Sequence, residues 1–71
     1  MARYTIIIEK GGKNYSAYCP DLPGVVAAGE TEEEIEELMK EAIEFHLDSL
    51  KEENLPIPEP TTRAKSVDVA V

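Results

Sequence analysis

The sequence predicts an α+β domain with the element order β-β-β-α-β, in which one long helix covers one face of a mixed four-stranded sheet. Three observations support this fold class: short alternating segments near the N-terminus, one long amphipathic stretch, and a final alternating segment at the C-terminus. Two short connections make the first three strands antiparallel. A helical crossover, which is right-handed as a rule, sets the last strand parallel to the first. The predicted strand order is therefore 3-2-1-4.

The first two strands form a predicted β-hairpin. Residues 3–9 alternate between two faces, and three consecutive isoleucines in this segment make both faces apolar, which is typical of a central strand. The segment Lys10-Gly11-Gly12-Lys13 is expected to turn, with the paired glycines supplying positive φ angles. Residues 14–19 then alternate again and form the second strand.

A rigid loop is expected at Pro20-Asp21-Leu22-Pro23-Gly24, because two prolines fix two φ angles and Gly24 permits a sharp change of direction. Residues 25–29, with the sequence Val-Val-Ala-Ala-Gly, form a short third strand. Its small side chains indicate that another element packs closely on the sheet.

The helix is predicted over residues 32–53. Thr31 is a good N-cap, Glu34 three positions later completes a capping box, and three glutamates in the first turn suit the helix dipole. One face of the helix is apolar and the other acidic. The predicted apolar stripe is Ile35, Leu38, Met39, Ala42, Ile43, Leu47 and Leu50, and the predicted acidic face is Glu33, Glu37, Glu41, Glu44, Asp48 and Glu52. Asn54 and Pro56 are expected to end the helix.

The C-terminal part of the chain contains a spacer and a predicted fourth strand. Leu55-Pro56-Ile57-Pro58-Glu59-Pro60 alternates with proline and is expected to be an extended, stiff segment that returns the chain from the helix end. Residues 66–71 alternate valines at 67, 69 and 71 with smaller or polar residues, as a strand does.

Composition excludes several classes of protein. A chain of 71 residues accommodates one domain, expected to span residues 1–71 with no separate DNA-binding domain. Its single cysteine, Cys19, excludes a disulfide scaffold, and no apolar run approaches the roughly 20 residues of a membrane span. A net charge of −8 does not suit nucleic-acid binding, which depends on basic side chains. The expected location is the cytoplasm. The charge either keeps a small protein soluble or suits a strongly basic protein partner.

One helix cannot cover both faces of the predicted sheet, so the isoleucine strand leaves an apolar face open. We therefore expect a homodimer, a higher homo-oligomer or another protein partner. The alternative is a monomer in which tyrosine and threonine side chains screen the open face.

The histidine, the cysteine and the acidic run of this sequence do not form a recognisable catalytic or metal-binding pattern. His46 lies within the apolar stripe and is expected to be a core histidine, and Cys19 is expected to be a structural thiol. The run from Glu30 to Glu37 contains six acids in eight residues, but these diverge around the helix rather than converging on a metal ion. No metal site, cofactor or catalytic residue is predicted.

The segment from Tyr15 to Gly24, Tyr-Ser-Ala-Tyr-Cys-Pro-Asp-Leu-Pro-Gly, resembles the signature of the HicB family of antitoxins. The similarity continues through Gly29-Glu30-Thr31, the helix with Ala42, His46 and Leu47, and the proline-rich segment. The resemblance implies a partial RNase H-like fold. Nucleases of that fold need carboxylates near the middle of the first strand. Here isoleucines occupy that place and only Glu9 lies near the strand end, so nuclease activity is not expected.

The resemblance also implies a function. HicB antitoxins bind small basic RNases of the HicA type and mask their catalytic surface. The leading hypothesis is therefore a non-enzymatic antitoxin that binds a HicA-type toxin through Tyr18, Asp21 and Leu22 of the loop and through Glu33 and Glu37 of the helix. The alternative is a self-associating, dimeric module whose protein or ligand partner is not a toxin.

Overall fold

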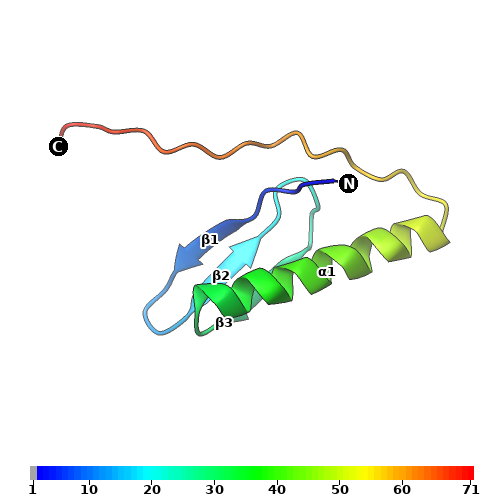
Figure 1. Cartoon of the computed structure of the whole chain (residues 1–71), viewed down its shortest axis with the longest axis horizontal. Helices are drawn as coiled ribbons and strands as arrows, with labels where there is room; N and C mark the ends of the chain where they lie inside the picture. The colour runs from blue at the N-terminus through cyan, green and yellow to red at the C-terminus, as the bar shows by residue number, and fades with distance from the viewer. Residues whose placement is uncertain (1) are drawn as a thin grey trace.

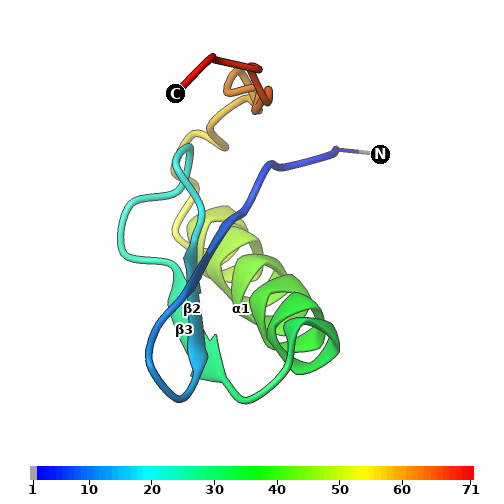
Figure 2. The same cartoon turned by 90° about the vertical axis from the view of Figure 1, so that its left-hand side faces the viewer.

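The computed structural model describes residues 2–71 and has the element order β-β-β-α. The strands are β1 (Ile7–Lys10), β2 (Tyr15–Tyr18) and β3 (Val26–Gly29), and the helix is α1 (Glu32–Glu52). The strands form one antiparallel sheet in the order β1-β2-β3 (Figure 1). In Figure 2, α1 lies on one side of this sheet and no helix lies on the other.

The predicted four-stranded mixed sheet of order 3-2-1-4 is wrong, and so is the final strand of the predicted β-β-β-α-β order. Residues 66–71 are extended but belong to no sheet, and the C-terminal end of the chain lies apart from the strands (Figure 1). Alternation in the sequence shows only which side chains would share a face of a strand. A strand also needs a neighbouring backbone to pair with, and in this structure residues 66–71 have none.

The strand register decides which side chains face the helix. Ile8 lies opposite Ala17, and Ala17 lies opposite Ala27, so this row shares the face on which α1 packs. Ile7, Tyr18 and Val26 form the neighbouring row on the other face of the sheet. We call this second row the open face. Its exposure agrees with the expectation that one helix covers only one side.

The core lies between α1, the sheet and the loop that joins β2 to β3. Its buried side chains are Ala17, Cys19, Leu22, Val25, Ile35 and Met39. The buried thiol of Cys19 confirms the predicted structural role. Leu38 of the predicted apolar stripe is 36% exposed, because the stripe is wider than the short sheet that it covers.

Both ends of α1 follow the local sequence signals. The Thr31 hydroxyl accepts a hydrogen bond from the Glu34 backbone N–H at 3.1 Å, as expected for an N-cap. At the other end, Asn54 takes a φ of 57°, and the N–H groups of Asn54 and Leu55 donate to the carbonyls of Lys51 and Leu50. This pair of bonds is a Schellman motif, so Asn54 ends the helix as predicted.

The hairpin between β1 and β2 forms as predicted, but the reason given for its turn is wrong. The Gly11 N–H donates to the Asn14 carbonyl at 2.7 Å, which closes the turn. Among the described residues, the glycine with a positive φ is Gly24, at 89°, in the loop before β3. The hairpin glycines therefore do not supply positive φ, whereas Gly24 makes the predicted change of direction.

Candidate partner-binding site

The loop between β2 and β3 is held by backbone hydrogen bonds at both ends. The Leu22 N–H donates to the Cys19 carbonyl and the Val25 N–H to the Leu22 carbonyl, each at 3.1 Å. The Cys19 N–H donates to the Val25 carbonyl at the same distance and closes the loop. The Leu22 side chain is fully buried, so it fixes the loop from inside and is not exposed to solvent. The loop is therefore rigid, as the prolines predict.

Asp21 joins this loop to the C-terminal part of the chain. Its carboxylate accepts hydrogen bonds from the Thr62 hydroxyl at 2.8 Å, the Thr62 backbone N–H at 3.1 Å and the Thr61 hydroxyl at 3.2 Å. These hydrogen bonds, those from Thr62 first, lower the pKa of the Asp21 carboxyl below its ordinary value. Asp21 is thus ionised at neutral pH and clamps residues about forty positions later in the sequence.

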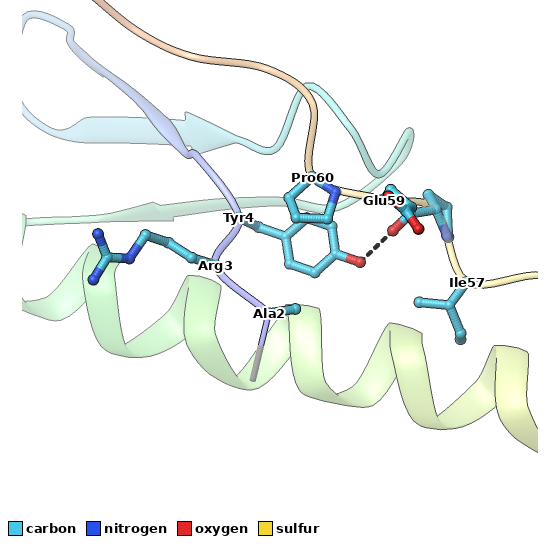
Figure 3. Close-up of a pocket in the computed structure, with 7 residues that line it drawn as sticks. Ala2, Arg3, Tyr4, Ile57, Glu59 and Pro60 are labelled. Carbon is cyan, nitrogen blue, oxygen red and sulfur yellow. Dashed lines mark hydrogen bonds between the residues drawn. The ribbon is translucent and has the colours of Figure 1, made fainter.

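Tyr4 makes the second contact that holds the returning chain. Its hydroxyl donates to the Pro58 carbonyl, and Figure 3 shows its ring beside Pro60. The Thr5 hydroxyl donates to the Thr62 carbonyl at 2.9 Å. Burial raises the pKa of the Tyr4 hydroxyl, and the neighbouring Cys19 and Asp21 raise it further. The proline-rich spacer therefore returns to the N-terminal residues, as the sequence predicts.

A shallow pocket of about 560 Å³ lies where these segments meet. Its lining consists of Ala2, Arg3, Tyr4, Ile57, Pro58, Glu59 and Pro60. The charged groups at its edge are Arg3 and Glu59, and no cluster of three potential metal ligands occurs anywhere in residues 2–71.

The exposed side of α1 carries the largest concentration of charge. The helix contains nine acidic residues and two lysines, so it accounts for nearly all of the net charge of −8. Glu33 and Glu37 are exposed and one helical turn apart, which places both carboxylates on the same side of α1. His46 is only partly buried on α1 and does not belong to the core cluster, so it is not the buried core histidine that the sequence predicts.

The five predicted partner-binding residues do not share one surface. Tyr18 lies on the open face and is 42% exposed, whereas Glu33 and Glu37 belong to α1 on the other side of the sheet. Asp21 lies near the clamp at the sheet end. Two separate surfaces are therefore available to a partner: the open face and the acidic side of α1.

Sequence reasoning missed Val26, Thr61 and Thr62. Val26 is 64% exposed beside Tyr18, and its position in a short apolar strand gave no signal that it would face outward. The two threonines follow the proline-rich spacer, and no local pattern identifies Asp21 as their partner.

Within the described residues, no helix is long and apolar enough to cross a membrane.

Comparison with known proteins identifies relatives along nearly the whole chain. A UPF0150 protein from Synechocystis is 38% identical over 71 aligned residues, which cover 96% of this chain and 87% of that protein. A UPF0150 protein from Thermoplasma acidophilum is 40% identical over 57 residues, covering 79% of this chain and 83% of the relative. An uncharacterised 14.9 kDa protein of Haemophilus phage HP1 is 40% identical over 55 residues, which are 78% of this chain but 41% of the phage protein.

No solved structure gave a significant match. The family model described as "HicB_like antitoxin of bacterial toxin-antitoxin system" matches residues 4–69, a range that includes the loop, α1 and most of the C-terminal segment. This chain therefore belongs to the HicB-like antitoxin family of bacterial toxin-antitoxin systems.

Proposed function

We propose that this protein is an antitoxin that binds and masks a small, basic RNase toxin of the HicA type. The observation that carries the proposal is the charge of α1, where nine acids against two lysines produce a strongly negative surface. A negative surface attracts a basic partner, speeds its association and disfavours acidic partners. Family membership supplies the class of partner, because an antitoxin acts on a toxin.

The proposed contacts follow the two exposed surfaces. Glu33 and Glu37 meet basic side chains of the toxin, while Tyr18 supplies an aromatic contact on the open face. Aromatic side chains are frequent anchors of protein interfaces. Asp21 and Leu22 act by fixing the loop that follows Tyr18, because rigidity lowers the entropy cost of binding.

We also infer that these residues do not bind nucleic acid directly. Phosphate groups need basic partners, and the helix of this chain is acidic. No catalytic role is proposed, because the family to which the chain belongs is one of antitoxins.

The decisive experiment combines co-expression with charge reversal. The wild-type chain should restore growth to cells expressing a HicA-type toxin and should co-purify with that toxin. The double variant Glu33→Lys/Glu37→Lys should bind the toxin at least about tenfold more weakly, which corresponds to about 1.4 kcal/mol. The loss should be smaller in high salt, where charges are screened.

A matched control reverses two glutamates at the other end of the helix. Glu52→Lys/Glu53→Lys makes the same change in net charge about 28 Å along α1 from Glu33, at 1.5 Å per residue. This control should change affinity by less than about threefold. Equal loss in both variants would show that net charge alone matters and would refute the proposed contact. Failure of the wild-type chain to bind or rescue would refute the antitoxin function.

A second candidate function is that of a self-associating module with a non-toxin partner. Tyr18 and Val26 on the open face favour it, since exposed apolar side chains in a row are often covered by another chain. Self-association without growth rescue or toxin binding would support this alternative.

A further inference from the structure

The end of the chain is extended and pairs with no strand within residues 2–71. We call residues 63–71 the tail. They begin directly after Thr62, which Asp21 and Thr5 hold against the domain, and then run away from the sheet (Figure 1). Val67 and Val69 are 79% and 72% exposed, and Val71 is fully exposed.

The tail prevents the molecule from being compact. The radius of gyration is 13.9 Å and the longest dimension is 48 Å. A compact domain of this length has a radius of gyration of roughly 11 Å. The excess reflects the extended tail, whose valines are exposed in an isolated copy.

A free sheet edge is available to receive such a segment. β1 is the terminal strand of the sheet and pairs with β2 on one side. On its other side, no hydrogen bond to another strand is recorded within residues 2–71. An unpaired edge presents a row of N–H and C=O groups that can bind an extended segment of another chain.

A groove lined by both apolar and charged side chains lies beside the same edge. α1 packs mainly on β2 and β3, which leaves its flank next to the N-terminal residues uncovered. The groove has a volume of about 960 Å³, and its apolar lining includes Ile6, Met39, Ile43 and Leu47. We call it the α1 groove. Ile6, Ile43 and Leu47 are only half-buried, so an added strand could cover them.

The tail is suited to both the free edge of β1 and the α1 groove. A strand places residues 67, 69 and 71 on one face, so three valines would point toward the α1 groove while Asp68 and Ala70 point away. Main-chain groups of the tail would at the same time pair with β1. In its own molecule the tail diverges from this edge after Thr62, so the edge is left free for the tail of a second copy.

We propose that two copies of this chain exchange residues 66–71, each binding along the free β1 edge of the other with its valines over the α1 groove. The arrangement is reciprocal, so two tails fill two edges and the assembly closes as a symmetric dimer. The proposal goes beyond toxin binding. Its failure leaves that proposed function intact, because toxin rescue and oligomeric state are measured separately.

The first test is the mass of the full chain in solution, measured by light scattering during size-exclusion chromatography. The wild-type chain should be a dimer at micromolar concentration. Val69→Asp places a charge over the α1 groove and should weaken dimerisation at least tenfold. The matched control Ala70→Asp introduces the same charge on the other face of the tail and should remain dimeric. Circular dichroism should show unchanged helix content, because neither residue contacts the core.

The second test locates the tail directly. Two isotopically distinct preparations of the wild-type chain are mixed, and intermolecular nuclear Overhauser effects are recorded. Contacts between Val69 methyl groups of one copy and Ile43 or Leu47 methyl groups of the other are expected. A monomeric wild-type chain, contacts within one copy only, or a dimer disrupted by Val26→Asp but not by Val69→Asp would each overturn the proposal.

Discussion

Replacing Leu22 with alanine should destabilise the whole domain, because this loop residue is part of the core. Its side chain is fully buried and clusters with Cys19, Val25, Ile35 and Met39. Leucine-to-alanine changes in protein cores cost about 2–5 kcal/mol. The total free energy of unfolding of a chain of 71 residues is roughly 4–10 kcal/mol. We expect the loss for Leu22→Ala to lie in the upper half of the range of about 2–5 kcal/mol. The hydrogen bonds at both ends of the loop prevent the loop from collapsing into the cavity that the substitution leaves.

Urea denaturation followed by circular dichroism at 222 nm measures this loss. For a domain of this size the dependence on urea is about 1 kcal/mol per molar, so the midpoint should fall by about 3.5 M or more. All variants need the same protein concentration, because any self-association would add to the apparent stability.

Two controls separate burial from residue type. Leu22→Met keeps the volume of the side chain and should cost less than about 1.5 kcal/mol. Phe45→Ala removes a larger side chain that is 76% exposed, and it should change stability by about 0.5 kcal/mol or less. A loss below 1 kcal/mol for Leu22→Ala, or a larger loss for Phe45→Ala, would refute the assignment of Leu22 to the core.

Two further predictions concern the helix start and the Tyr4 contact. Thr31→Ala removes the N-cap of α1 and should lower the free energy of unfolding by about 0.5–2 kcal/mol, whereas Thr31→Ser should be nearly neutral; equal losses in thermal melts would contradict the capping role. In an absorbance titration at 295 nm, the Tyr4 hydroxyl should ionise above the ordinary tyrosine pKa of about 10, and this late step should be absent from Tyr4→Phe. Because its pKa is raised in the folded state, the stabilisation from Tyr4 should be complete below pH 10 and lost as the pH rises through the folded pKa, so constant stability in that range would refute it.

The five site residues show how far sequence reasoning extended toward function. Glu33 and Glu37 were correctly expected on an exposed acidic helix face, because helical periodicity fixes which residues point away from the apolar stripe. The sequence places Leu22 in the predicted recognition loop with Asp21, which suggests contact with a partner. The burial of Leu22 depends on α1 and the loop packing together, which no local pattern encodes.

The sequence by itself determined the local structure of this protein. Thr31 and Asn54 set the ends of α1, Gly24 allows the turn before β3, and the alternating segments place the three strands. Such signals act over a few residues, so they can be read from a single chain. The tertiary structure decided how distant segments meet. Asp21 binds Thr62 forty-one residues later, and the tail then leaves the sheet instead of joining β1. The alternating sequence of the tail decides which of its side chains would share a face of a strand. Whether the tail pairs as a strand depends on a free sheet edge lying close to it, and the position of that edge is decided by the whole fold.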